Sequence, residues 1–368
     1  MPPEKPIWKR DVSTSSPQVC NVKELLPFAG KKVDFIREVL NSAQTSEKAL
    51  AGKISYSAAR HELFSFCPRA CYYRYYAAQG GWDPYAGEFA QKVFRLKYRR
   101  TLEGEAASIL SRSLSRMLFY EEEYPEEDLD ADRENRSAVF LKKWKFFTSN
   151  EVWKMGKALE EEAWRNDPKM PDFLELHGEN PLFNSPRELL DFLIENLKEF
   201  FREAEMDSLF IPTLAGISRE AWRSSLLFRN FTIENIPIVL PPFLMVLHRG
   251  IAARISFSFR FSGKEYQTKE IVDAYGENST LSDRLFGLFA ERTFPGHTPE
   301  KWEAAFRKGR LSFHPSPITP LPLPFLLESA EKIFAFSRQE PFLSRDSFPC
   351  REEKEPCRHC RYFSLCNG

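Results

Sequence analysis

The chain has 368 residues, of which 42% are hydrophobic and 14% aromatic, enough for one large domain or two ordinary ones with a buried core. Its 52 basic and 52 acidic residues give a formal net charge of zero, so the field of the whole molecule does not favour a polyanionic partner. No apolar stretch reaches the roughly 20 residues that span a bilayer, and no signal peptide is apparent. We therefore expect a soluble, cytoplasmic protein without a membrane partner.

The first two thirds of the chain are expected to be mostly helical. Residues 1–50 are interpreted as a peripheral segment. In 51–100, Ser55 or Ser57 is a candidate cap for a helix that stops before Pro68, and a second, aromatic helix follows. Residues 101–235 carry Leu, Phe, Glu, Lys and Arg at helical spacing, which predicts a mostly helical insertion.

Strand patterns are expected only after residue 235. Alternation of apolar and polar residues predicts strands at 236–240, 251–261 and 266–274, with a hairpin turn at 262–264. The pattern then predicts a helix over 281–292, an extended proline-rich connector over 314–324 and a helix over 325–338. Residues 236–345 are thus expected to form a sheet with flanking helices, and 346–368 a cysteine-rich tail. This order predicts an α/β (α+β) fold.

The cysteines are the most informative residues. There are seven of them: Cys20, Cys67, Cys71, Cys350, Cys357, Cys360 and Cys366. An odd number, crowded toward the C-terminus, argues against a secreted disulfide framework and for thiolate ligands in a reducing compartment. The last three are spaced C-x2-C-x5-C, which zinc and iron–sulfur sites both use.

A fourth thiolate would have to come from elsewhere in the chain. Cys67 is preferred because it lies at the turn before Pro68, with Cys350 and His359 as substitutes. Structural zinc usually takes its ligands as two close pairs, whereas here three lie together. Cys20 and Cys71 are expected to be small buried residues.

Two charged segments are candidates for binding a partner. The first combines basic residues with Phe94 and Tyr98, a composition that pairs phosphates and stacks bases but also fits a solvated helix face. Its basic residues are Lys92, Arg95, Lys97, Arg99 and Arg100. The second is an acidic run over 121–132, which is expected to be an exposed loop or a docking site for a basic partner.

Two segments at opposite ends of the chain resemble a known family. Residues 55–75, which include Phe66-Cys67-Pro68-Arg69, and residues 356–366 are similar to the PD-(D/E)XK nucleases of the CRISPR-associated Cas-four, AddB and exonuclease V group. In that family one early cysteine and a late C-x2-C-x5-C hold a [4Fe–4S] cluster. The resemblance implies such a cluster on Cys67, Cys357, Cys360 and Cys366, with zinc as the alternative, and a nuclease-like core sheet flanked by helices.

The positions that carry catalysis in that family are substituted here. Ser108 follows Gly104 where the family has a metal-binding histidine, and Ala253 follows Gly250 where it has a metal-binding carboxylate. Tyr275 replaces the lysine two residues after Asp273, and Arg284-Leu285 keeps only the leucine of the next motif. Hydrolysis with Mg²⁺ or Mn²⁺ would then need a migrated site, for which Asp273, Lys269 and Glu265 are the candidates.

These substitutions predict a catalytically inactive nuclease-fold subunit. The resemblance implies that it binds DNA, as a single strand, a duplex end or both, and docks a helicase, nuclease or integrase partner. The implied setting is DNA-end processing or prokaryotic defence, including CRISPR systems. Two alternatives stay open: an active Mn/Mg-dependent DNA exonuclease with migrated residues, and a protein-binding scaffold without nucleic-acid affinity that uses the acidic run or the proline segment 315–324.

Overall fold

A computed structural model describes most of the chain beyond residue 54. The described residues all belong to the compact unit Gly52–Gly368 and comprise 55–78, 81, 83, 85–119, 133–163, 167, 170–177, 181–225, 229–261, 280–338, 345, 348–350 and 360–366. The peripheral segment 1–50, the acidic run 121–132 and the strand expected at 266–274 with its turn lie outside them. Among the described helices, none is long and apolar enough to cross a membrane.

The first described helix, α3 (Ala58–Phe66), begins where the sequence predicts a cap. The Oγ atom of Ser57 accepts a hydrogen bond from the backbone nitrogen of Arg60 at 3.2 Å, which satisfies one of the donors left open at a helix start. Cys67 is extended, with φ −158° and ψ 109°, and Pro68 opens α4 (Pro68–Tyr72). The helix predicted before Pro68 is therefore confirmed, and the aromatic helix after it continues as the π-helix η2 (Tyr73–Ala77).

The helical middle of the chain is confirmed, but it ends earlier than residue 235. Its helices are α5 (Glu88–Tyr98), α6 (Leu102–Phe119), α7 (Arg133–Glu160), α8 (Pro186–Met206) and α9 (Phe210–Ala215), with the single turns η6 (Leu174–Leu176) and η7 (Arg219–Ala221). Two strands, β1 (Trp222–Ser225) and β2 (Arg229–Ile233), already lie within the range expected to be helical.

The described strands form a mixed five-stranded sheet and a separate two-stranded one. The larger sheet has the order β1-β4-β5-β6-β7, and β2 pairs with β3. The strands not yet named are β3 (Ile236–Leu240), β4 (Phe243–His248), β5 (Ile251–Arg260), β6 (Thr298–Arg307) and β7 (Arg310–Pro317). Only β5 and β6 run parallel, and α10 (Thr280–Thr293) lies between them in sequence, as a parallel crossover requires. The fold is thus mixed α/β.

Two-residue hairpins set the register of three of the four antiparallel pairs of described strands, β2/β3, β4/β5 and β6/β7. Both central residues have positive φ in each hairpin, the conformation whose twist matches that of the flanking strands. These pairs are Glu234-Asn235, Arg249-Gly250 and Lys308-Gly309. Glycine or asparagine at the second position adopts this conformation at low cost.

Besides β1 and β2, three more of the described strands, β4, β6 and β7, were not predicted from the sequence. No strand was predicted at the position of β4. β6 has the helix-like composition Glu-Lys-Trp-Glu-Ala-Ala, yet it pairs with β5 on one side and with β7 on the other. Residues 314–317, predicted to be a polyproline-like connector, belong to β7 instead. Pro315 and Pro317 are tolerated there because β7 is an edge strand. The helices expected at 281–292 and 325–338 are confirmed as α10 and α11 (Leu323–Arg338).

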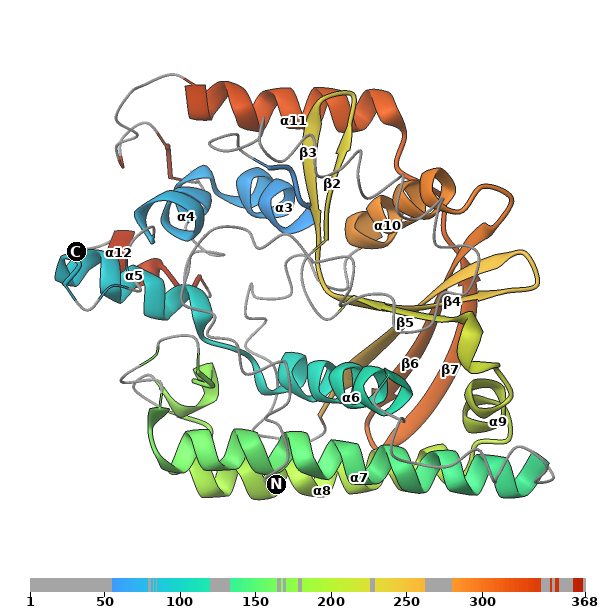
Figure 1. Ribbon diagram of the computed structural model, residues 1–368. Coiled ribbons are helices and arrows are strands. Elements are labelled where there is room, and N and C mark those ends of the chain that lie inside the picture. The colour runs from blue at the N-terminus through green and yellow to red at the C-terminus, as the bar shows by residue number, and fades with distance from the viewer. Residues whose placement is uncertain are drawn as a thin grey trace, which may run out of the picture. The chain divides into compact units, whose positions relative to one another are not determined.

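Helices cover both faces of the large sheet (Figure 1). One face packs against α6, α7, α8 and α9 through Ile255, Phe257 and Phe259 of β5, which share a hydrophobic cluster with the buried side of those helices. The other face packs against α10 and α11 through β4 residues such as Met245. Ala253 lies on the same face as these three residues of β5, whereas Arg254 points to the other face, where it pairs with Asp283 of α10, so the expected alternation of apolar and polar residues is confirmed.

Candidate functional site

The segment that carries Cys67 and the C-terminal tail pack against each other. Leu63, Cys67, Cys71 and Tyr73 form one hydrophobic cluster with parts of α5 and with Tyr362 and Leu365 of the tail. The short helix α12 (Phe363–Cys366) lies in that cluster, next to α4 and α5 (Figure 1). Residues almost 300 positions apart in sequence are therefore neighbours.

Side-chain to backbone hydrogen bonds fasten the tail in this place. The guanidinium of Arg361 donates to the carbonyl oxygens of Leu96 and Lys97 at 2.8 and 2.7 Å, at the end of α5. The Tyr73 hydroxyl donates to the carbonyl of Leu365 at 3.0 Å.

Two further arginines tie the segment before the tail to its neighbours. Arg69 on α4 donates to the carbonyl of Phe348 at 2.7 Å, and Arg345 donates to that of Cys366 at 3.0 Å. Each bond uses a charged donor, which makes it stronger than a neutral one.

Three of the four candidate ligand cysteines belong to this hydrophobic cluster or pack against it. Cys67 is 5% exposed, and Cys360 and Cys366 pack against the cluster that contains it. The pKa of the Cys366 thiol is raised to about 11, first by burial and then by Cys350, through charge and a hydrogen bond, and by Cys67, while a hydrogen bond with Tyr73 lowers it. Cys366 is therefore close to both Cys350 and Cys67.

The proposed ligand set is only partly visible. Cys357 and His359 lie outside the described residues, as does Cys20. Within the described part of the chain, no group of three or more His, Cys, Asp or Glu side chains is arranged to hold a metal ion. Cys67, Cys360 and Cys366 nonetheless lie in or against one hydrophobic cluster, so thiols from both segments are present at the junction. Cys71, expected to be a buried structural residue, is 1% exposed.

The positions compared with the nuclease motifs hold no metal-binding carboxylate or histidine among the described residues. Ala253 is fully buried on the face of β5 that packs against the helices α6 to α9. Ser108 on α6 accepts a hydrogen bond from Arg112 at 2.5 Å. The candidates for a migrated site, Asp273, Lys269 and Glu265, lie outside the described residues.

The predicted basic segment divides into an exposed and an internally paired part. Lys92 and Arg95 on α5 are exposed. The Lys97 amino group lies 5.4 Å from the centre of the Tyr98 ring. Arg99 pairs with Asp172 at 3.0 Å, and Arg100 pairs with Glu105 at 2.7 Å.

Base stacking by this segment has less support than its sequence suggested. Phe94 is only 2% exposed, so it cannot receive a base. Of the two aromatic residues in the segment, only Tyr98 is partly accessible. The interleaved pattern therefore reflects a helix with one buried side rather than a stacking platform.

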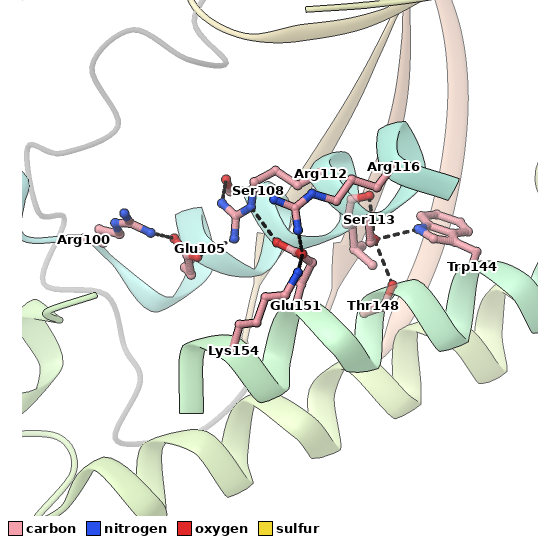
Figure 2. Close-up of polar contacts among 11 residues, drawn as sticks. Arg100, Glu105, Ser108, Arg112, Ser113, Arg116, Trp144, Thr148, Glu151 and Lys154 are labelled. Carbon is pink, nitrogen blue, oxygen red and sulfur yellow. Dashed lines mark hydrogen bonds and ion pairs between the residues drawn. The ribbon is translucent and has the colours of Figure 1, made fainter. Parts of the chain in front are cut away.

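A charged network on α6 and α7 was not anticipated from the sequence (Figure 2). Two nearly buried carboxylates, Glu105 and Glu151, lie among four cations that reach solvent. Glu105 accepts from Arg100 at 2.7 Å and from Arg112 at 2.8 Å. Glu151 pairs with Arg112 at 3.2 Å, with Lys154 at 3.4 Å and with Arg116. We call the four cations, Arg100, Arg112, Arg116 and Lys154, the basic row.

The basic row fixes the ionisation of its buried carboxylate. Burial raises the pKa of Glu105, but the guanidinium groups of Arg112 and Arg100 lower it by more, so the pKa of Glu105 lies below its ordinary value. Burial likewise opposes the charge of Arg112, and the two glutamates outweigh it and raise the pKa of Arg112. Glu105 and Arg112 are therefore both charged at neutral pH.

Replacing Glu105 with glutamine is expected to lower the free energy of unfolding at pH 7 by about 2 kcal/mol, since it removes the buried charge that Arg100 and Arg112 share. The loss should be smaller than the roughly 3–5 kcal/mol of a wholly buried pair, because both arginines keep about a third of their side chains exposed. Urea titrations of both proteins measure the difference.

The same substitution makes a prediction about pH. Because the folded pKa of Glu105 is lowered, its contribution is complete above the ordinary value of 4.5 and is lost as the pH falls through the folded pKa. The stability gap between wild type and Glu105→Gln should therefore narrow below pH 4.5. Glu195→Gln, which breaks an exposed pair with Lys198, is the control and should cost under about 0.5 kcal/mol. A gap that stays constant with pH would contradict the assignment.

Comparisons with known proteins add no family to this description. No family model matches the chain, and a search of curated proteins found no match. The resemblance to nucleases therefore rests on the residues quoted above and stays a prediction.

Proposed function

We propose that this chain is a catalytically inactive nuclease-fold subunit that is held together by an iron–sulfur cluster and binds DNA. The observation that carries the proposal is the junction between the Cys67 segment and the C-terminal tail. A cluster on one early and three late cysteines requires that these segments meet, and Cys67, Cys360 and Cys366 lie at one junction. The spacing of the cysteines in the sequence does not by itself require these two segments to meet.

The ligands proposed for the [4Fe–4S] cluster are Cys67, Cys357, Cys360 and Cys366. Cys350 is the substitute for Cys357, since it hydrogen-bonds to Cys366. The cluster would serve as a cross-link between the two chain ends, and zinc on the same thiolates would do the same. Its proposed role is structural, because it would link the two segments that meet in the hydrophobic cluster.

Two observations support the loss of hydrolysis. Alanine at position 253 offers no oxygen to Mg²⁺ or Mn²⁺, and its burial leaves no room for a hydrated ion beside it. Ser108, at the histidine position, is engaged by Arg112. The proposed activity is therefore to bind a DNA strand or duplex end and to present it to a helicase, nuclease or integrase partner, in DNA-end processing or prokaryotic defence.

The test uses full-length protein purified without oxygen. Labelled single- and double-stranded DNA is incubated with it in Mn²⁺ or Mg²⁺, and iron is assayed on the same sample. We expect binding without cleavage and about four irons per chain. Cleavage that disappears in Asp273→Ala would instead identify an active nuclease with migrated residues. A loaded cluster without DNA affinity would identify a protein-binding scaffold.

A further inference from the structure

We propose that the turn between β6 and β7, at the edge of the large sheet (Figure 1), binds the phosphate backbone of DNA. The turn carries three cations within four successive residues, Arg307, Lys308 and Arg310, which we call the basic turn. This inference rests on the proposed function and names the residues that hold the nucleic acid. It involves neither the cysteine junction nor the charged network of α6 and α7.

The first argument is that the basic turn has no ion-pair partner. All three of its cationic side chains are exposed. None of them makes a hydrogen bond or a salt bridge with any other residue in the part of the chain that the structure describes. The charge of Arg307 acts on Glu303, but that carboxylate already pairs with Lys301 at 3.2 Å. The three charges are therefore available to a ligand.

The positive surplus remains when the neighbouring charges are counted among the described residues. Arg260, which lies beside Arg307 in register, pairs with Glu103 at 3.0 Å. The network on the same strands toward α10 contains two cations and two carboxylates, namely Arg254, Lys301, Asp283 and Glu303. The basic turn therefore adds a local surplus of three positive charges to a chain whose formal net charge is zero.

The second argument is that this arrangement is unfavourable in the free protein. Arg307 and Arg310 lie directly opposite each other on β6 and β7, and Arg260 lies on the other side of Arg307. Neighbouring strands are only about 5 Å apart, and like charges directly opposite each other destabilise a sheet. Protection of the sheet edge does not explain Arg307, because β6 is an inner strand, and β7 already carries Pro315 and Pro317. A bound anion would relieve the repulsion.

The third argument is that the backbone holds these cations in place. Lys308 and Gly309 both have positive φ, 53° and 71°, the conformation of a tight two-residue hairpin. A lysine adopts this conformation at a cost, so asparagine or glycine would suit the position better. The backbone nitrogen of Lys308 also donates to the carbonyl of Arg260 at 3.3 Å, which fastens the turn to β5. A turn that is ordered beforehand loses less entropy when a ligand binds.

The surface that continues from the turn along β7 suits a chain of phosphates better than a single small anion. Arg310 and His314 lie on one face of β7, both exposed, while Phe313 packs into the core on the opposite face. They are separated by about 13 Å along the strand. Guanidinium and imidazole N–H groups both donate to phosphate oxygens, and β7 contains no acidic residue that would repel them. Successive phosphates can therefore contact the turn and His314 together.

The test replaces the two arginines and leaves the turn itself intact. Arg307→Gln/Arg310→Gln removes two charges that repel each other, so the variant is expected to fold and its thermal midpoint should not fall. The control is Lys142→Gln/Arg292→Gln, which removes two exposed cations, one on α7 and one in the last turn of α10, and changes the net charge equally. Fluorescence anisotropy of labelled single-stranded and duplex DNA is measured at several salt concentrations.

We expect Arg307→Gln/Arg310→Gln to bind DNA roughly tenfold more weakly and the control to bind like wild type. The slope of log K against log salt should fall by about 1.4 on a single strand and about 1.8 on a duplex, because each phosphate contact contributes about 0.7 or 0.9. Arg307→Lys/Arg310→Lys keeps both charges and should retain the wild-type slope. Lys308→Asn fits the positive φ better, so it should raise the thermal midpoint while weakening binding.

The outcomes separate this inference from the proposed function. Wild-type protein that does not bind DNA would overturn both. Wild-type affinity and slope in the folded Arg307→Gln/Arg310→Gln variant would overturn the inference and leave the proposed function standing. Equal losses in this variant and in the control would show that only net charge matters, which also overturns the inference. Polyglutamate that competes as well as DNA would identify an acidic protein as the ligand and overturn it too.

Discussion

Replacing Cys366 with serine is expected to abolish the iron–sulfur chromophore and to release the C-terminal tail from α4 and α5. Besides the hydrogen bonds of Arg361, Tyr73 and Arg345, the described part of the tail is held by the buried side chains of Tyr362 and Leu365, and α12, with four residues, is too short to be stable alone. Binding of a metal group to thiolates is coupled to folding, so its loss should cost more than the hydrogen bonds of the tail can offset. Iron content, the visible absorption spectrum and proteolysis of the tail measure the effect.

Two further cysteine variants make this result specific. Cys71→Ala removes a thiol that is 1% exposed and is not a proposed ligand, so it should retain full iron while losing some packing energy. Cys350→Ser and Cys357→Ser, compared with each other, identify which of the two completes the set, and we expect Cys357→Ser to lose iron. Full iron in Cys366→Ser would refute the cluster. Zinc in place of iron would leave the cross-link between the two segments in place and change only the identity of the metal.

Replacing Trp144 with alanine is expected to lower the free energy of unfolding by about 3–5 kcal/mol, the range for large aromatic residues in a core. The Trp144 ring is fully buried and contacts Phe200 and Phe201 of α8, Phe210 of α9 and Phe257 of β5. It thus joins three helices to one face of the sheet. Chemical denaturation of both proteins measures the loss.

The indole nitrogen of Trp144 adds a polar component. It donates to the Ser113 hydroxyl at 3.0 Å, and Ser113 shares a hydrogen bond with Thr148 at 2.9 Å (Figure 2). Trp144→Phe keeps most of the ring volume but loses this donor, so it should cost less than alanine. Trp153→Ala on the same helix is the control, because its ring is largely exposed, and it should change stability by less than about 0.5 kcal/mol. Equal losses at both positions would contradict this description of the core.

Local signals in the sequence predicted the features that depend on neighbouring residues. Ser57 caps α3, Pro68 separates α3 from α4, and the alternation in β5 places its side chains, each decided within a few positions. Gly309 is a similar local signal for a hairpin turn, but no hairpin was predicted at Lys308-Gly309. β6 could not be predicted in this way, because its helix-like composition is overridden by pairing with β5 and β7.

The candidate site was predictable only where spacing carried the information. The close pairing of cysteines in the tail indicated a shared centre, and Cys67 stood out because of the proline after it. The basic row was missed, since Arg112 and Arg116 are ordinary residues on a helix until Glu151, which is distant in sequence, comes beside them. Arg99 and Arg100 differ from the exposed Lys92 because each pairs with a carboxylate. The partner of Arg99, Asp172, is distant in sequence, so the sequence alone did not reveal this pairing.

The junction at Cys67 has a consequence for how the chain is made. The hydrogen bond from Tyr73 to Leu365 spans 292 positions, so the first described helices leave the ribosome long before the segment that completes their hydrophobic cluster. Until then Cys67 and the aromatic side chains of η2 have no tail to cover them, a condition that invites aggregation or binding to a chaperone. Contacts of such long range also slow folding. The proposed metal group, which would use Cys360 and Cys366, could therefore be assembled only after these residues have been synthesised.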